Sequence, residues 1–306
     1  MKDKIVCILL GIFLAFAGLE LFLRLLGFGY DLVHKTSPRA GEGYRIYCVG
    51  ESTTWGVGAS DRASKNYPRQ LEEMLNKQYP SANVQCLFDQ TIGQNTSEIL
   101  AKLPRHIMKY RPQLIVLLVG VNNRWNMDRS NILLFSKNTT VSRATLQVLI
   151  FLDQFRVWKL FKSLAFAYGF PKEHWDFFVP PSGEAREELE RKKEEAGSIF
   201  DDLAEHDIEE MIKLCKASHI PVILCTYPMH TTIGLRRSQQ DLARQFDVPL
   251  VDHYEAFQKL QDPQAYLWPK DSWHPNDAGY ELMAKNIYDC ILRNRFVEGA
   301  EKKISR

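Results

Sequence analysis

The sequence has few cysteines, and their spacing supports neither a disulfide framework nor a cysteine-based metal site. Six cysteines are spread over 306 residues, and no two of them form a C-x-x-C pair. Cys7 lies in an apolar N-terminal run, and the five that remain cannot all pair within the chain because their number is odd. Cys48 and Cys225 lie in apolar, strand-like runs, where cysteine usually acts as a small hydrophobic residue. The cysteines therefore leave the redox compartment open.

A strong charge of either sign is also missing. The net charge is only +2, and the sequence has no basic stripe, zinc-finger spacing or RNA-binding aromatic signature, so we expect no nucleic-acid partner. The histidines show no H-E-x-x-H or paired spacing, which gives no reason to expect a metal. We expect no cofactor of any kind. His253 follows Asp252 at the end of a strand-like run, and we interpret it as a structural residue.

Long apolar runs are rare, but the N-terminus contains one. Ile5 to Leu26 is interrupted only by Glu20 and Arg24, and as one helix it is long enough to cross a hydrocarbon core of roughly 30 Å. We interpret residues 1–27 as a membrane anchor. A cleaved signal peptide, with its cleavage site near Ala17, and a buried core helix are the alternatives.

The N-terminal segment also predicts where the protein is found. Apolarity resumes after Ala17 and no polar mature start follows, which favours the anchor over the signal peptide. Lys2 and Lys4 favour a cytoplasmic N-terminus, so the rest of the chain lies outside the cytoplasm. Secretion after cleavage would place it on the same side of the membrane.

Short apolar runs alternate with amphipathic stretches over most of the remaining chain. Residues 28–43 are interpreted as a linker, 44–296 as one domain and 297–306 as a polar tail. Continuous apolar strands separated by helices predict a doubly wound, three-layer α/β/α fold around a parallel sheet of about five strands. The expected strands are Tyr44–Val49, Val84–Phe88, Leu114–Val119, Pro221–Thr226 and Pro249–Val251, and the expected helices are Tyr67–Tyr79, Thr96–Tyr110 with an interruption at Pro104, and Pro275–Leu292 with Pro275 in its first turn.

Residues 124–196 break this alternation and are interpreted as an insertion. Leu146 to Phe170 is rich in aromatic residues, and Glu184 to Glu195 is densely charged. The charged stretch is typical of a solvated helical face. The aromatic stretch is expected to pack on the domain; an acyl-chain pocket and contact with lipid are the alternatives.

Polar residues that suit acyl-transfer chemistry follow the predicted strands. Ser52 comes directly after the first strand, where its hydroxyl would be exposed and nearby backbone N–H groups could stabilise an anion. Asp271 precedes His274 by three residues, a spacing at which the carboxylate can accept a hydrogen bond from the imidazole. A helix N-cap for Ser52 and a turn for Asp271 are the structural alternatives.

Two further residues could meet a developing oxyanion. Asn122 follows the clearest strand, and Gly93 follows the second, where its N–H can closely approach a substrate. Either residue alone would suit an ordinary turn. Ends of separate strands thus supply a nucleophile, a base with its orienting group, and oxyanion donors.

These blocks together resemble those of the SGNH hydrolases, also called the GDSL lipase and esterase family. Gly50-Glu51-Ser52 resembles the first block, and Gly93, Asn122 and the Asp271–His274 pair fall in the later three. The resemblance implies a flavodoxin-like fold, Ser52, His274 and Asp271 as catalytic residues, and an oxyanion hole from Ser52, Gly93 and Asn122. The sequence departs from the family at two positions, since Glu51 and Asn123 stand where aspartate is usual or frequent.

The expected function is that of a serine esterase that cleaves O-acyl groups from a lipid or a carbohydrate through an acyl-enzyme on Ser52. A membrane-tethered O-acyltransferase acting on an envelope polymer or glycan is the first alternative, because the two differ only in the acceptor. The second alternative is a non-catalytic binding or assembly protein on the same fold. The acyl chain length and the oligomeric state are left open.

Overall fold

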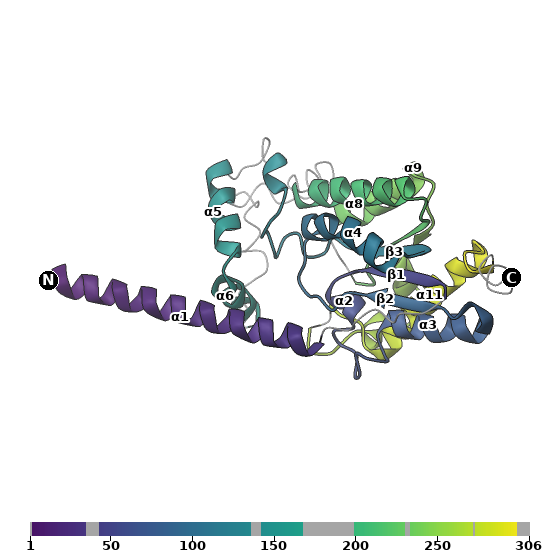
Figure 1. The fold of residues 1–306 in the computed structure, drawn as a ribbon, viewed down its shortest axis with the longest axis horizontal. Helices are drawn as coiled ribbons and strands as arrows, with labels where there is room; N and C mark the ends of the chain where they lie inside the picture. The colour runs from purple at the N-terminus through teal and green to yellow at the C-terminus, as the bar shows by residue number, and fades with distance from the viewer. Residues whose placement is uncertain are drawn as a thin grey trace. The chain divides into compact units, whose positions relative to one another are not determined.

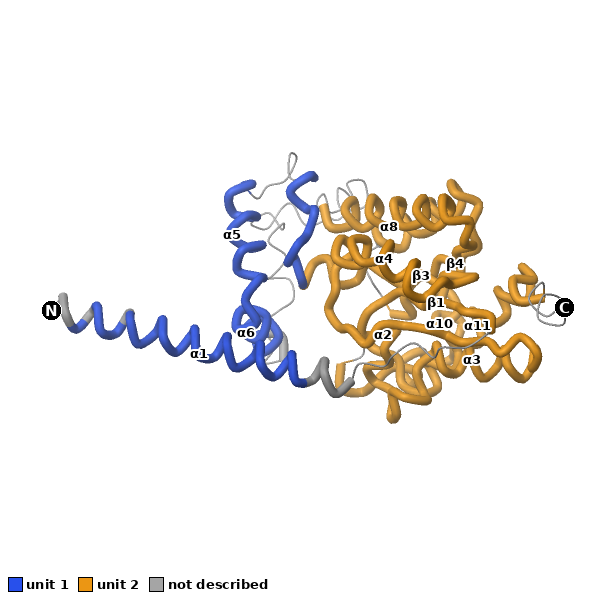
Figure 2. The backbone as a smooth tube through the Cα atoms, viewed as in Figure 1, with its two compact units in different colours: residues 1–37, 126–186 blue, residues 38–125, 187–306 orange. Residues whose placement is uncertain are grey.

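The computed structural model describes residues 2–34, 43–135, 142–167, 199–229, 233–271 and 273–298. It divides the chain into two compact units, drawn in separate colours in Figure 2. One unit consists of residues 1–37 and 126–186, and the other of residues 38–125 and 187–306. Residues 126–135 and 142–167 of the predicted insertion therefore group with the N-terminal helix.

The larger unit contains a five-stranded parallel sheet in the order β2-β1-β3-β4-β5. The prediction of a doubly wound α/β/α fold is confirmed, and all five predicted strands are present. Register is fixed by pairs such as Ile46 opposite both Cys86 and Leu114. The strands are β1 (Arg45–Gly50), β2 (Gln85–Phe88), β3 (Leu114–Leu118), β4 (Val222–Cys225) and β5 (Leu250–Val251).

Helices cover both faces of this sheet, which is why β3 is buried along its whole length. Helices α4, α8 and α9 pack against one another on one face, and α3 and α11 pack together on the other (Figure 1). The helices of this unit are α2 (Ser52–Trp55), α3 (Tyr67–Gln78), α4 (Thr96–Tyr110), α8 (Ile199–Ala217), α9 (Ile233–Gln245), α10 (His253–Gln258) and α11 (Asp277–Arg293), with short 3-10 turns at Pro80–Ala82 and Pro263–Tyr266.

Two sequence-based expectations about proline are wrong. Helix α4 runs through Pro104 without a break. Pro104 is exposed, so water can hydrogen-bond the Leu100 carbonyl that proline leaves without an N–H donor. Pro275 is not in the first turn of α11, because Asn276 is the N-cap and its side chain accepts from the Gly279 N–H. Pro275 instead forms a bridge with Leu267, which fixes the loop before the helix.

The smaller unit contains the N-terminal helix α1 (Lys2–His34), the turn Ile132–Leu134, and helices α5 (Arg143–Asp153) and α6 (Arg156–Ala167). Within α1, Val6–Gly29 is 24 residues long with a mean hydropathy of 2.6, enough to cross a membrane; a signal sequence has the same features. The helix extends beyond residue 27, where we expected the linker to begin, and residues 35–42 lie outside the described part. The charged stretch Glu184–Glu195 and residues 299–306 also lie outside it.

Candidate active site

Ser52 is the first residue of α2 and is separated from the end of β1 only by Glu51. Helix α2 has only four residues, and it ends at Gly56, whose N–H donates to the carbonyls of Ser52 and Thr53. Gly56 has a φ of +94°, which an L-residue with a side chain rarely adopts. This glycine lets the chain turn sharply, so that Ser52 stays at the carboxyl edge of the sheet.

His274 and Asp271 lie beside Ser52, although 222 residues separate the serine from the histidine. The Nε2 atom of His274 is 2.8 Å from Ser52 Oγ, and its Nδ1 atom is 2.6 Å from Asp271 Oδ2. Burial acts to raise the pKa of Asp271, but hydrogen bonds from the Trp273 N–H and from His274 outweigh it and hold the pKa below its usual value. The carboxylate therefore stays ionised next to the imidazole.

The loops that carry Ser52 and His274 are tied to each other. The Tyr280 hydroxyl of α11 donates to the Val57 carbonyl over 2.6 Å. The Ser60 N–H donates to the Asp277 carboxylate over 2.8 Å, and the Ser60 hydroxyl binds the same group. In addition, the Trp268 N–H donates to the His274 carbonyl over 2.7 Å. These contacts fix the separation between the serine and histidine loops.

Gly93 and Asn122 lie on either side of the Ser52 turn. They follow β2 and β3, the two neighbours of β1 in the sheet, and the carboxyl ends of parallel strands share one edge. Gly93 has a φ of +68° and no atom near the place that a Cβ would occupy. The Nδ2 atom of Asn122 is buried and has no close hydrogen-bond acceptor among the described residues, although its amide lies near the Glu51 carboxylate and acts to lower the pKa of that group. A buried amide donor without a close protein acceptor is uncommon and is suited to an acceptor supplied from outside.

The contact that holds Glu51 has no counterpart among the sequence-based predictions. Its side chain is fully buried, and the Tyr227 hydroxyl donates to its two carboxylate oxygens at 2.7 and 3.0 Å. Burial raises the pKa of Glu51 to about 7, against the lowering effect of hydrogen bonds from Tyr227, from backbone N–H groups and from the Asn122 side chain. Tyr227 lies just after β4, so the glutamate is held from the far side of β3. A tyrosine after a strand has no local signature that predicts this contact.

Asn123 acts on the fold rather than at the site. Its side chain accepts from the Thr96 N–H and donates to the Thr96 hydroxyl, both at 2.9 Å. Asp207 of α8 accepts from the hydroxyls of Thr96 and Ser97 at 2.6 and 2.7 Å. The start of α4 is therefore fixed by polar groups from the loop after β3 and from α8. An asparagine suits this position because it can both donate and accept.

Neither His253 nor a metal cluster adds a second reactive centre in the part of the chain that the structure describes. His253 is fully buried, and burial lowers its pKa to about 3, so the ring is neutral and structural. Among the described residues, no group of three or more histidine, cysteine, aspartate or glutamate side chains is arranged to hold a metal ion.

Comparison with known proteins identifies the family. The model described as the GDSL-like lipase/acylhydrolase family matches residues 48–282. No curated protein matches the sequence. Similar solved structures include a lipase/acylhydrolase from Enterococcus faecalis, with 14% identity over 81% of this chain and 95% of that one and a TM-score of 0.49.

Two similar structures are esterases by name. The psychrotrophic esterase EstA from Pseudoalteromonas sp. has 12% identity over 81% of this chain and 97% of that one, with a TM-score of 0.46. A catalytic mutant of Axe2, an acetylxylan esterase from Geobacillus stearothermophilus, has 15% identity over 82% and 95%, with a TM-score of 0.48. The family match extends from β1 into α11 and confirms the resemblance seen in the sequence blocks. The chain belongs to the GDSL-like lipase/acylhydrolase family and is a serine hydrolase of ester bonds.

Proposed function

We propose that the protein cleaves carboxylic esters through an acyl-enzyme on Ser52. The observation that carries this proposal is the chain of short contacts from Ser52 Oγ to His274 Nε2 (2.8 Å) and from His274 Nδ1 to Asp271 (2.6 Å). A serine hydroxyl is a weak nucleophile until a base accepts its proton, and an imidazole acts as that base when a carboxylate fixes its tautomer.

The reaction proceeds in two steps. His274 takes the proton of Ser52 while Oγ bonds to the ester carbonyl carbon. The tetrahedral intermediate collapses, and the protonated imidazole gives its proton to the departing alcohol. Water then attacks the acyl-enzyme with His274 as base, and the acid leaves as the proton returns to Ser52 Oγ. Asp271 stabilises the imidazolium in both steps and stays ionised itself.

The oxyanion is stabilised by the N–H groups of Ser52 and Gly93 and by the amide of Asn122. The buried Nδ2 of Asn122 supports this role, because no close acceptor among the described residues occupies it and its contact with Glu51 is a longer one. The surroundings of Gly93 support its role, since no atom lies within 4 Å of the place that a Cβ would occupy and a substrate can approach the backbone there. Donors fixed in advance stabilise the developing charge without reorganisation.

The substrate we propose is an O-acyl group carried by a lipid or a carbohydrate. We also propose that α1 stays in the membrane as an anchor and that the catalytic unit lies outside the cytoplasm. The length and apolarity of Val6–Gly29 support the anchor, and Lys2 and Lys4 support the orientation.

The test is hydrolysis of p-nitrophenyl esters, from acetyl to long acyl, by the full chain in a mild detergent. Ser52→Ala and His274→Ala should each lower turnover by at least roughly 10³-fold. Ser64→Ala is the matched control, because Ser64 is exposed and bonds only within its own loop. Equal turnover in the parent and both site variants would contradict the serine mechanism. Turnover that requires an added sugar acceptor would favour acyl transfer over hydrolysis.

A further inference from the structure

Helices α5 and α6 expose an unusual amount of apolar surface for two neighbouring short helices. Positions three or four residues apart lie on one face of a helix, so the exposed residues of each helix form a stripe. Soluble surfaces rarely leave large apolar side chains exposed together unless they bind a partner. We call these residues the apolar patch: Val148 (56% exposed), Phe151 (57%), Leu160 (38%), Phe161 (54%) and Leu164 (46%).

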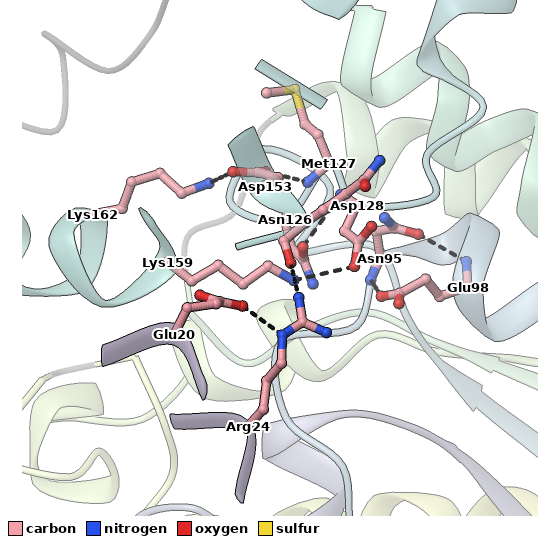
Figure 3. A network of polar contacts seen from close by, with 11 residues as sticks. Glu20, Arg24, Asn95, Glu98, Asn126, Met127, Asp128, Asp153, Lys159 and Lys162 are labelled. Atoms are coloured by element: carbon pink, nitrogen blue, oxygen red, sulfur yellow. Dashed lines mark hydrogen bonds and ion pairs between the residues drawn. The ribbon is translucent and has the colours of Figure 1, made fainter. Parts of the chain in front are cut away.

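Three charged side chains of the same two helices, Asp153, Lys159 and Lys162, are paired within their own unit. Lys162 forms an ion pair with the fully buried Asp153, which also accepts from the Met127 N–H over 2.7 Å. Lys159 lies 3.5 Å from Asp128. Figure 3 shows these pairs. The lysines therefore turn toward acidic partners of the unit, and the apolar patch is left as the outward surface.

The start of α6 is bound to the apolar helix α1. Glu20 Oε2 accepts from the Val157 N–H over 3.0 Å, and Arg156 donates to the Leu23 carbonyl over 2.9 Å. Arg24 donates to Glu20 over 2.7 Å, as Figure 3 shows, and also to the Gln154 carbonyl over 3.0 Å. We call Glu20, Arg24 and Arg156 the clasp.

The clasp explains why a carboxylate interrupts the apolar run. Glu20 is only 8% exposed, whereas the leucines on either side of it are 41% and 60% exposed. A carboxylate inside an apolar segment is costly unless it is paired, and here it meets an arginine and a free N–H group at the start of a helix. A spanning helix alone gains nothing from Glu20, so its presence points to docking of α6.

The position of the clasp along α1 predicts its depth in a bilayer. With Val6 at one boundary of the hydrocarbon core, a rise of about 1.5 Å per residue places Glu20 roughly 21 Å and Arg24 roughly 27 Å into a core of about 30 Å. The clasp therefore lies within about 10 Å of the opposite boundary. That is the depth at which amphipathic helices with aromatic apolar faces bury those faces.

We propose that helices α5 and α6 form a membrane-interface hairpin, which docks on α1 through the clasp and inserts the apolar patch into the same leaflet. The proposal rests on the anchor role of α1. Its occupant is lipid, because α6 packs on α1, a helix whose own exposed apolar side chains are suited to lipid. The protein is then held in the membrane at two places, by α1 and by the apolar patch of the hairpin.

Depth-dependent fluorescence quenching of the full chain in phosphatidylcholine–phosphatidylglycerol vesicles tests this proposal. Cys7 is the one exposed cysteine among those present, and the other five are buried. A polarity-sensitive label on Cys7 reports on α1. In a Cys7→Ser background, the label is placed by Phe151→Cys or Phe161→Cys, and by Met108→Cys as the control on α4, where the native side chain is 71% exposed.

Labels at 151 and 161 should be quenched severalfold more by a lipid-borne quencher near the headgroups than by aqueous iodide, and the label at 108 should show the reverse. Quenching by lipid at Cys7 but not at 151 or 161 would overturn the hairpin and leave the anchor intact. If lipid-borne quenchers also fail to quench the label on Cys7, both the anchor and the hairpin are wrong.

Replacing the clasp carboxylate separates docking from simple adsorption. Glu20→Leu removes the acceptor for the Val157 N–H and should reduce lipid quenching at 151 and 161 while Cys7 stays in the membrane. Glu20→Gln keeps an acceptor oxygen and should preserve most of the quenching. If Glu20→Leu leaves quenching unchanged, the clasp does not hold the hairpin and the proposal is wrong.

Discussion

Replacing Glu51 with glutamine should stabilise the protein increasingly as the pH rises from about 4.5 to above 7, relative to the parent. Burial raises the pKa of Glu51 from an ordinary value of 4.5 to about 7, so the folded state holds the proton more tightly than the unfolded chain does. The carboxyl therefore contributes stability that is fully present below about pH 4.5 and is lost as the pH rises through about 7.

The size of the effect follows from the same two pKa values. A carboxyl with a pKa of 4.5 unfolded and about 7 folded contributes roughly 3 kcal/mol over this pH range, a large share of a typical unfolding free energy of about 5–15 kcal/mol. The Glu51 side chain is fully buried, so solvent screening does not reduce this contribution. Because glutamine cannot ionise, the unfolding free energy of the Glu51→Gln variant lacks this pH-dependent contribution.

His253 makes the comparison with the parent essential. Burial lowers its pKa to about 3, so protonation of the unfolded chain costs stability at low pH, and stability is regained as the pH rises toward 6.5. The two groups act in opposite directions over overlapping pH ranges. The raw curve of the parent can therefore look flat, and only the difference between the parent and Glu51→Gln isolates the glutamate.

Urea unfolding of the full chain in detergent, between pH 4.5 and 8.5, measures this difference. Tyr227→Phe removes a hydroxyl that lowers the Glu51 pKa, so the loss of stability should move to higher pH. Tyr280→Phe is the matched control, since the Tyr280 hydroxyl donates to the Val57 carbonyl instead. Parallel curves for the parent and Glu51→Gln would refute the reasoning, as would a shift to lower pH in Tyr227→Phe.

Two variants test the chemistry at the site. Asp271→Asn should lower kcat by roughly 10⁴-fold with folding preserved, because asparagine favours the wrong imidazole tautomer; an undiminished kcat for p-nitrophenyl acetate would remove Asp271 from the mechanism. Asn122→Ala should lower kcat by about 10²- to 10³-fold with little change in KM, because its amide acts on the transition state. An increase in KM at constant kcat would instead make Asn122 a substrate-binding residue.

The sheet and the position of the site could be predicted from the sequence for one physical reason. Strands buried on both faces are continuous apolar runs, and in a parallel sheet the residue after each strand lies at a shared edge. Ser52, Gly93 and Asn122 each follow such a run, so the order of motifs along the chain was enough to place them. The Asp271–His274 pair could be predicted because the two residues are only three positions apart in the chain.

The rest depends on contacts that have no local pattern. Glu51 and Tyr227 are 176 residues apart, and nothing near either residue indicates that they meet. Glu20 looked like an interruption of an anchor, because its partner at Val157 lies 137 residues away. Pro104 was expected to break a helix, but its effect depends on whether the side of the helix that it occupies is exposed to water.

These long-range contacts also account for how Ser52 keeps its position. A helix of four residues has little stability of its own, since forming the first turn is unfavourable. The turn is instead held by Tyr227 through Glu51, and by Tyr280 and Asp277 of α11 through the segment after the turn. Because α11 begins two residues after the His274–Pro275 pair, the helix that holds the serine loop also holds the histidine loop. Any displacement of α11 therefore moves both loops together, and this common support preserves the 2.8 Å contact between Ser52 and His274.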